Sequence, residues 1–339
     1  VPKSRKTGKT VRLVTLHGRS EIRMEDWKHM CKIISTLGME REAWLQLRKG
    51  GIGGSDAGAV CGLNPYRSPM AVYYEKTSDT IDVSDNEAMR QGRELEEYVA
   101  QRFMEETGLK VRKSNKMYWS TDYPFMYADV DRLIVGEDAG LECKTVSPYS
   151  ADKWEDGAVP LHYLVQCYHY MIVTGKRCWY IAALIFGQKF IYSKIEWDET
   201  FVNQIIALEE DFWNGCVVPK RIPLPDGSDS SSAVLEAYFR ESDNEGAVTL
   251  TTDMENKLDR RQAIAEKIKQ LEQEKTQIEQ EVKLFMDGHS FANSERYQVS
   301  WQMVDSQRVN TKKLKAEQPE IYKKYLQVNQ SSRFTVQVA

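Results

Sequence analysis

The stretch that decides the fold is residues 128–146, ADVDRLIVGEDAGLECKTV. Its apolar runs predict two β-strands, residues 128–135 and 141–146, joined by the turn at residues 137–140. Pairing of the strands as a hairpin would bring Asp131 and Glu142 to one end of a sheet. Because side chains alternate along a strand, Glu142 and Lys144 would project from the same face. The stretch therefore predicts two carboxylates and a lysine gathered at a sheet edge.

This set of side chains suits metal-assisted chemistry. Carboxylate oxygens hold Mg²⁺ or Mn²⁺, and the Cys143 backbone carbonyl lies between the two motif residues as a further oxygen ligand. Lys144 would orient or deprotonate an attacking water while the metal stabilises charge on a scissile phosphate. Two alternatives stay open. Asp129 shares a strand face with Asp131 and is a second candidate acid, and a Glu-x-Lys triplet also occurs by chance on exposed strands.

The surrounding sequence predicts a mixed α/β core. Gly108 and Gly175 each follow an amphipathic helix, as expected at helix C-termini. The predicted helices are residues 24–47, 70–76, 87–107, 161–174 and 198–213, and the further strands are residues 11–16, 110–112, 116–120, 177–185 and 189–195. Gly50 to Gly54 interrupt the first part of this order, and Ser55-Asp56 follow as a candidate helix N-cap.

The composition changes near Pro223, where prolines and a serine run predict a connector over residues 223–247. From residue 254 to 285 the chain is polar and helical, with an apolar 4-3-7-4-3 spacing interrupted by Lys275. This pattern predicts a helical hairpin arm or a short coiled coil. The predicted domains are residues 1–245, a core; 246–289, a helical arm; and 290–339, a small α+β tail.

Composition limits the class of protein without naming a function. The 339 residues are 41% hydrophobic and 28% charged, which is typical of globular chains. A net charge of −4 argues against a protein that coats nucleic acid by bulk electrostatics, yet it permits a DNA enzyme with a local basic channel. No apolar run predicts a membrane span, and no signal peptide is recognised, so we expect a cytoplasmic protein. The six cysteines form no C-x-x-C pair and are expected to be free thiols.

Six motifs in order carry a resemblance to a known family. They are Arg48 with residues 52–56 (IGGSD), Gly92-x-x-Leu95-Glu96, Ala128-x-x-Asp131, residues 140–144 (GLECK), Tyr163-x-x-Gln166, and Phe212-Trp213. Over residues 44–215, about half of the chain, the sequence resembles the YqaJ family of viral recombinases. These are relatives of phage lambda exonuclease in the PD-(D/E)xK superfamily. The resemblance implies a restriction-endonuclease-like core, a mixed central sheet flanked by helices, here followed by the C-terminal helical arm and small α+β tail.

The resemblance also implies roles for the catalytic residues. Asp131, Glu142 and the Cys143 carbonyl would bind the metal, two Mg²⁺ ions per site with Mn²⁺ tolerated, and Lys144 would position the water. Glu96 would assist the metal site directly or through water. Gln166 and Tyr163, one helical turn apart, would support the nucleophile and the phosphate.

A second implied site is a pocket for the 5′-terminal phosphate, formed by Arg48 and Ser55. An arginine fork, a hydroxyl and glycine-exposed amides at a helix N-terminus together bind anions. The alternative for Gly50 to Gly54 is a flexible turn with no ligand.

The implied function is a 5′-to-3′ double-stranded DNA exonuclease that starts at 5′-phosphorylated ends and leaves 3′ single strands for recombination by annealing. The expected partners are DNA ends and a RecT/Beta-type single-strand annealing protein. A ring-like homo-oligomer, a trimer, and a phage or prophage origin in a bacterial host are also implied. The alternatives are an endonuclease or nickase, for which Arg48 and Ser55 have no use, and a non-catalytic DNA-binding or assembly protein.

Other segments have simpler interpretations. His162 and His169 are expected to be structural or surface residues, and residues 179–185 (WYIAALI) a core strand. The basic residues Lys3 to Arg12 form either a DNA-backbone contact or a plain basic arm. The arm and tail suggest oligomerisation or partner docking, or a tail that folds back over the nuclease cleft.

Overall fold

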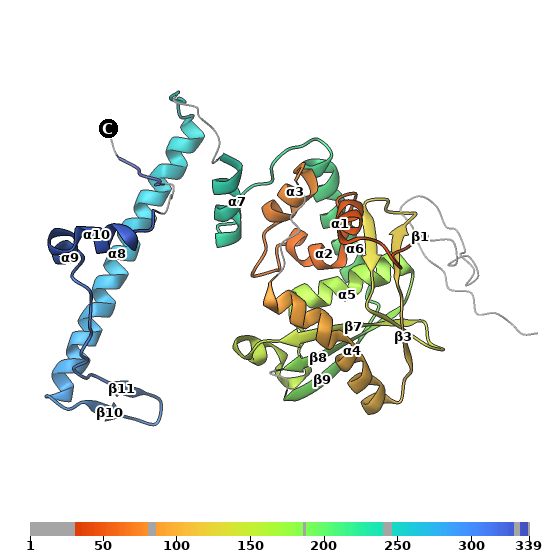
Figure 1. The fold of residues 1–339 in the computed structure, drawn as a ribbon, viewed down its shortest axis with the longest axis horizontal. Coiled ribbons are helices and arrows are strands. Elements are labelled where there is room, and N and C mark those ends of the chain that lie inside the picture. The colour runs from red at the N-terminus through yellow and green to blue at the C-terminus, as the bar shows by residue number, and fades with distance from the viewer. Residues whose placement is uncertain (1–30, 81–85, 186–187, 240–245, 329–332, 338–339) are drawn as a thin grey trace, which may run out of the picture. The chain divides into compact units, whose positions relative to one another are not determined.

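The structure is a computed structural model that describes residues 31–80, 86–185, 188–239, 246–328 and 333–337. The chain divides into two compact units, residues 1–240 and 241–339 (Figure 1). The expected strand at residues 11–16 and the basic arm at residues 3–12 lie outside the described residues. Within the described ranges, no helix is long and apolar enough to cross a membrane.

A five-stranded mixed sheet is the centre of the first unit, with the order β3-β6-β7-β8-β9 (Figure 1). Its strands are β3 (Val111–Lys113), β6 (Arg132–Ile134), β7 (Ala139–Val146), β8 (Cys178–Ile185) and β9 (Lys189–Glu196). Only the β7–β8 pairing is parallel; the other three pairings are antiparallel. Helix α4 (Glu87–Thr107) packs on β7 and β8, and α5 (Leu161–Thr174) packs on β8 from the opposite face. The predicted mixed sheet flanked by helices is confirmed.

Alternation along the strands assigns each side chain to a face. In β8, Trp179 and Ile181 are fully buried in the core that α5 helps to form, whereas Tyr180 and Leu184 belong to the core beneath α4. Burial of side chains on both faces explains why this strand reads as a continuous apolar run. In the neighbouring β7, Leu141 packs toward α4. Glu142 and Lys144 therefore face α5.

A second sheet of four strands, in the order β1-β4-β5-β2, lies beside the first. Its strands are β1 (Cys31–Ser35), β4 (Lys116–Ser120), β5 (Met126–Asp129) and β2 (Ile52–Gly53), and the helices of this region are α1 (Arg41–Arg48), α2 (Gly54–Val60), α3 (Pro69–Thr77) and α6 (Glu199–Phe212). Helix α5 contacts β4 and β5 as well as β8, so one helix serves both sheets. Both α4 and α5 end where predicted, because Gly108 and Gly175 adopt left-handed φ values of 73° and 71°.

Two predicted elements near the site are wrong. A helix over residues 24–47 is replaced, within the described part, by strand β1 and the shorter helix α1. The β-branched pair Ile33-Ile34 joins the antiparallel ladder with β4, and Gly38 turns the chain at a φ of 73°. A single strand over residues 128–135 is in fact two strands of different sheets, β5 and β6. Asp131 lies in the break between them rather than on a strand.

The connector predicted over residues 223–247 is wrong for its middle part, where Asp229–Phe239 form α7. The hydroxyl of Ser228 accepts a hydrogen bond from the Ser231 amide, so the serine run begins a helix instead of avoiding one.

The second unit contains one long helix, α8 (Thr252–Met286). A hairpin of two helices is therefore wrong, and the apolar seam of α8 stays exposed in the structure, with Ile268 and Leu271 at 50% and 54%. The described residues after α8 form β10 (Phe291–Asn293), β11 (Gln298–Ser300), α9 (Thr311–Glu317) and α10 (Pro319–Lys324). These short elements agree with a small α+β tail.

Candidate active site

The antiparallel pairing of β6 with β7 brings the two acids together. Arg132 pairs with Leu141, which places Asp131 beside Glu142. Asp131 precedes β6 and lies outside the strand pairing. Its carboxylate accepts a hydrogen bond of 2.8 Å from the Cys143 amide. That bond fixes the Asp131 side chain against the edge of β7.

Lys144 and Gln166 complete the centre on the face that α5 covers. The Lys144 ammonium lies 2.6 Å from Glu142 Oε1 and donates to Gln166 Oε1 at 3.1 Å. The Gln166 amide donates to the same Glu142 oxygen at 2.7 Å. Glu142 is only 3% exposed and Gln166 only 5% exposed. Glu142 therefore does not lie on an exposed strand face, as the simpler interpretation of the Glu-x-Lys triplet assumed.

Tyr163, one turn before Gln166 on α5, forms the wall next to the lysine. Its ring centre lies 4.7 Å from the Lys144 nitrogen, and the rings of His162 and Trp154 pack against it. Burial tends to lower the pKa of Lys144, but the Glu142 charge outweighs it and holds that pKa above its usual value. The ammonium therefore stays charged in this arrangement.

The carboxylates are arranged so that a cation would stabilise them. Burial, with the Glu142 and Glu96 charges adding to it, raises the pKa of Asp131 well above its ordinary value. The second oxygen of Glu142, Oε2, is buried and has no hydrogen-bond partner within the described part of the structure. An unsatisfied carboxylate oxygen in the interior is costly unless an ion or water binds it.

No group of three or more His, Cys, Asp or Glu side chains stands ready to hold a metal in the described ranges. Magnesium does not need such a cage, because it commonly uses one or two carboxylates and keeps several waters. Asp131, Glu142 Oε2 and the Cys143 carbonyl supply oxygen ligands only, which suits Mg²⁺ and disfavours zinc.

Asp131→Asn is expected to stabilise the metal-free protein. The amide oxygen can still accept from the Cys143 amide, while the repulsion between the neighbouring Asp131 and Glu142 carboxylates disappears. We expect Tm to rise by about 2–4 °C in metal-free buffer. We also expect Mg²⁺ to lose its own stabilising effect on the variant. Thermal melts with and without Mg²⁺ test both points, and a lower Tm without metal would contradict the repulsion.

Glu96 lies on α4 close to this centre but already has a partner. Its carboxylate receives a hydrogen bond from Arg132, and Glu97 accepts from the same guanidinium at 2.8 Å. Arg132 is only 2% exposed and also donates to the Asp131 carbonyl at 2.8 Å. The structure thus connects Glu96 to Asp131 through Arg132.

Arg48 and Ser55 form the second predicted site. The Arg48 guanidinium donates to the Ser55 hydroxyl at 3.1 Å and to the Tyr127 hydroxyl at 2.9 Å. Its flat face lies over the Trp44 ring, at 4.5 Å from the centroid. The arginine is thereby held in place next to an exposed hydroxyl, as the expected anion pocket requires.

Sequence reasoning missed the charges behind this pocket. Asp56, fully buried, binds Arg67 at 2.5 Å and Lys76 at 2.7 Å. Burial tends to raise the pKa of the Asp56 carboxyl. The charges of Lys76, Arg67 and Arg48 outweigh burial and hold this pKa well below its usual range. The helix begins earlier than expected, with Gly53 as N-cap and the Asp56 carboxylate accepting from the Gly53 amide. Spacing alone gave no signal for Arg67 and Lys76, which come from the turn before α3 and from α3 itself.

The glycines between the two sites are required by close packing. A Cβ on Gly53 would lie 2.5 Å from the Tyr127 hydroxyl, and a Cβ on Gly54 would lie 2.3 Å from the Tyr170 ring. Both glycines are buried. The flexible-turn interpretation is therefore wrong for this pair, because the segment is packed between two tyrosines.

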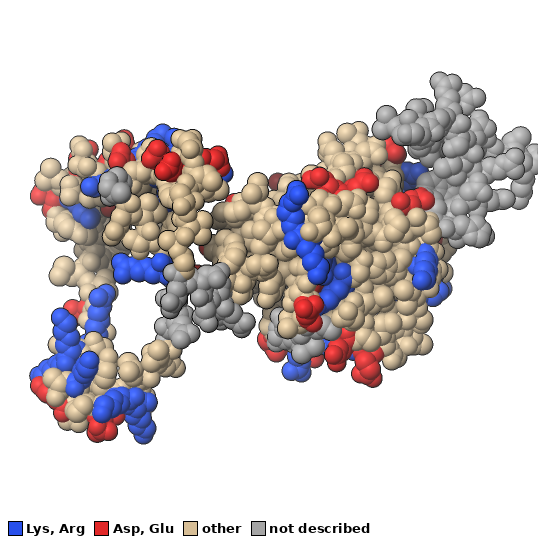
Figure 2. Space-filling view, turned by 90° about the horizontal axis from the view of Figure 1, so that it is seen from above, with Lys and Arg blue, Asp and Glu red and all other residues tan. Residues whose placement is uncertain are grey.

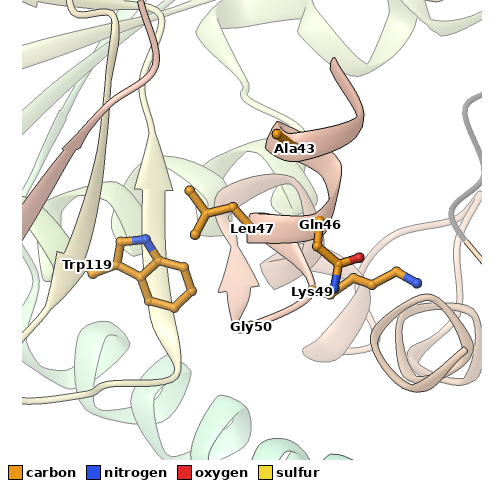
Figure 3. A pocket seen from close by; sticks show the side chains of 6 residues that line it. All are labelled: Ala43, Gln46, Leu47, Lys49, Gly50 and Trp119. Carbon is orange, nitrogen blue, oxygen red and sulfur yellow. The ribbon is translucent and has the colours of Figure 1, made fainter. Parts of the chain in front are cut away.

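An open apolar recess of about 660 Å³ lies on a different face of α1, lined by Leu47 and Trp119 among others (Figure 3). It contains no acidic side chain. Trp44, on the face of α1 that carries Arg48, donates to Asp129 at 2.7 Å. The second candidate acid is thus engaged by a tryptophan.

The two histidines of α5 differ in role. His169 is fully buried between Glu209 and the Tyr127 carbonyl, each at 2.8 Å, so its structural role is confirmed. His162 is half-buried, with its ring centre 4.0 Å from that of Tyr163. The predicted core strand is likewise confirmed by β8, and all six cysteines, each within the described ranges, are free.

His162 predicts a pH effect on stability. Burial, together with the Lys144 and Lys153 charges, lowers its pKa from 6.5 to about 4. As pH falls, His162 binds a proton in the unfolded chain at a higher pH than in the folded chain. The stability that neutral His162 contributes is therefore present above pH 6.5 and lost as pH falls toward 4. We expect the Tm of a His162→Phe variant to fall less steeply across that interval than the wild-type Tm. Equal slopes in parallel melts would show that His162 is not responsible.

Comparisons with known proteins locate this site within a family. Residues 43–177 match the sequence model of the YqaJ-like viral recombinase domain. The chain is also 36% identical over 301 residues to the uncharacterized protein YqaJ of Bacillus subtilis (strain 168), covering 88% of this chain and 94% of that protein. The chain belongs to the YqaJ family. The matched range holds every candidate catalytic and phosphate-pocket residue of this YqaJ-family protein.

Two solved structures are similar to this YqaJ-family chain. An alkaline exonuclease of Laribacter hongkongensis is 20% identical, with a TM-score of 0.46, over 53% of this chain and 94% of that one. A phage-related exonuclease of Haemophilus somnus 129PT is 11% identical, with a TM-score of 0.39, over 52% of this chain and 99% of that one.

Proposed function

We propose that this YqaJ-family protein is a Mg²⁺-dependent DNA nuclease that degrades duplex DNA from 5′-phosphorylated ends in the 5′-to-3′ direction. The observation that carries the proposal is the buried Glu142, with one oxygen unsatisfied, beside Asp131 and within 2.6 Å of Lys144. Two acids and a lysine held together at a partly buried site are typical of catalytic centres.

The residues of the site have separate roles in the proposed hydrolysis. Asp131, Glu142 Oε2 and the Cys143 carbonyl would hold the metal, for which we propose two Mg²⁺ ions with Mn²⁺ tolerated. When bound, Mg²⁺ supplies charge stabilisation at the scissile phosphate and a more acidic water. Lys144, which stays charged, orients the attacking water and adds positive charge near the phosphate. Gln166 and Tyr163 hold the lysine in place, and Glu96 acts on the centre through Arg132.

The pocket at Arg48 and Ser55 gives the proposal its specificity for DNA ends. A terminal phosphate carries more negative charge than an internal one and fits an arginine fork with a hydroxyl beside it. Charged side chains on one face of the molecule form small patches of both signs, rather than one broad basic area (Figure 2). Local contacts of this kind, not bulk charge, would then select the substrate.

The experiment compares three substrates in Mg²⁺: linear duplex with a 5′-phosphate, the same duplex with a 5′-hydroxyl, and closed circular DNA. The proposal predicts rapid loss of the phosphorylated duplex, slow loss of the hydroxyl form and an intact circle. Cutting of the circle would favour an endonuclease or nickase on the same core. No cleavage of any substrate would favour a non-catalytic DNA-binding or assembly protein.

The 3′ single strands left by this reaction are the substrate of annealing recombination. We therefore propose a RecT/Beta-type annealing protein as partner in the cytoplasm of a bacterial host, and a phage or prophage origin for the nuclease itself. A ring-shaped trimer would keep the enzyme on one DNA molecule, and no membrane is involved in this scheme.

The unit that begins after residue 240 is the proposed assembly or docking part. Its helix α8 exposes an apolar heptad seam, which in water favours association with another helix. Deletion of residues 246–339 is expected to lower the number of subunits per particle or the affinity for the annealing partner while metal binding is retained. Light scattering, with the mass divided by that of the shortened subunit, and a pull-down with the partner measure this. An unchanged subunit number and an unchanged affinity would remove the assembly role.

A further inference from the structure

Tyr170 lies where the two halves of the site meet. It follows Gln166 by one turn of α5 and is only 4% exposed. Its hydroxyl accepts a hydrogen bond of 2.8 Å from the Gln166 amide. Its ring packs against Gly54, at a distance that leaves no room for a Cβ there. One side chain thus contacts both the catalytic centre and the first turn of α2, which carries Ser55.

The hydrogen bonds of Gln166 leave its amide a single orientation. The Lys144 ammonium is a donor only, so the Gln166 oxygen must face it. The two amide hydrogens then point to Glu142 Oε1, at 2.7 Å, and to the Tyr170 hydroxyl, at 2.8 Å. Without the Tyr170 hydroxyl, the second hydrogen has no acceptor, and only Lys144 and Glu142 hold the amide. The Gln166 amide is then less firmly fixed, and its hold on Lys144 and Glu142 weakens.

We propose that Tyr170 is a positioning residue for the nuclease reaction. Its hydroxyl fixes the orientation of the Gln166 amide and, through Gln166, the positions of Lys144 and Glu142. Its ring, packed against Gly54, fixes the position of these groups relative to the pocket formed by Arg48 and Ser55. The effect on rate rests on the proposed nuclease function, whereas the effect on Gln166 does not.

The test is Tyr170→Phe, with Tyr168→Phe as the matched control. Tyr168 is on the same helix, and its hydroxyl donates to the Glu196 carbonyl at 2.9 Å, outside the site. On phosphorylated linear duplex we expect kcat of Tyr170→Phe to fall about fivefold, the worth of one neutral hydrogen bond. KM and the preference for 5′-phosphate over 5′-hydroxyl should stay unchanged, because the ring remains against Gly54. Tyr168→Phe should keep the wild-type kcat.

A merely structural role would change KM, the end preference and Tm together, or would affect both variants alike, and either outcome overturns the proposal. So does a wild-type kcat in Tyr170→Phe.

A second readout does not depend on activity. In metal-free protein labelled with ¹⁵N-glutamine, the Gln166 side-chain amide is assigned by its loss in Gln166→Ala. We expect its signal to shift and its hydrogens to exchange faster in Tyr170→Phe, but not in Tyr168→Phe. An unchanged Gln166 signal overturns the proposal even if the protein cleaves DNA. If the wild type cleaves nothing while the signal changes as expected, the proposed function fails and the positioning role stands.

Discussion

Lys144→Ala is expected to lower the rate of DNA hydrolysis by roughly 10²- to 10⁴-fold, the range for loss of a positioned group that handles a proton or water. Lys144 is the cation that bridges Glu142 and Gln166, at 2.6 Å and 3.1 Å. Its removal leaves Glu142 without its ion-pair partner and the water without an orienting donor. The measurement is single-turnover degradation of 5′-phosphorylated duplex in saturating Mg²⁺.

The matched control is Lys153→Ala. Lys153 is exposed, and its ammonium lies over the Tyr66 ring at 5.7 Å. It should retain most of the wild-type rate, and both variants should still bind DNA ends in the absence of metal. A Lys144→Ala enzyme that keeps within tenfold of the wild-type rate would remove Lys144 from the mechanism.

Arg48→Ala is expected to abolish the distinction between phosphorylated and hydroxyl ends. A charge-assisted hydrogen bond is worth about 1.5–3 kcal/mol, so the rate on phosphorylated duplex should drop by roughly 10- to 150-fold at subsaturating DNA. The rate on 5′-hydroxyl duplex should change little, because that end offers no charge to the guanidinium. Parallel kcat/KM measurements on the two duplexes give the ratio directly.

Two further variants separate charge at the pocket from general effects. Ser55→Ala removes one neutral hydrogen bond and should reduce the end preference by only severalfold. Arg102→Ala removes a guanidinium of α4 that pairs with Glu105 and Glu106 on the surface, and should leave the preference intact. If Arg48→Ala slows both duplexes equally, the arginine supports the fold through Tyr127 and Trp44 and does not recognise the phosphate.

The sequence was sufficient for the elements that local pattern controls. Glycine after an amphipathic run predicted the ends of α4 and α5, and a run of apolar residues predicted β8, buried on both faces. Period-two alternation placed Glu142 and Lys144 on one face, where they lie 2.6 Å apart. Each of these features depends on residues close in the chain, whose geometry is fixed by the helix or strand that holds them.

Features that depend on distant contacts were missed. Asp131 appeared to be a strand residue, yet its backbone lies where the chain passes from one sheet to the other. Lys76 and Arg67 reach Asp56 only after α3 packs beside α2. No local pattern singles out Tyr170, and only the packed structure shows its hydroxyl at Gln166. Tertiary packing, not propensity, decides such contacts.

The central claim is that the Asp131–Glu142–Lys144 centre hydrolyses DNA from the 5′ end. The most direct measurement follows a linear duplex labelled either at its 5′-terminal phosphate or at its 3′ end, with Mg²⁺ present. We expect the 5′ label to be released as a mononucleotide from the first turnover, while the 3′ label stays in a long single strand. Release of the 3′ label first, or labelled fragments cut from within the duplex, would contradict it.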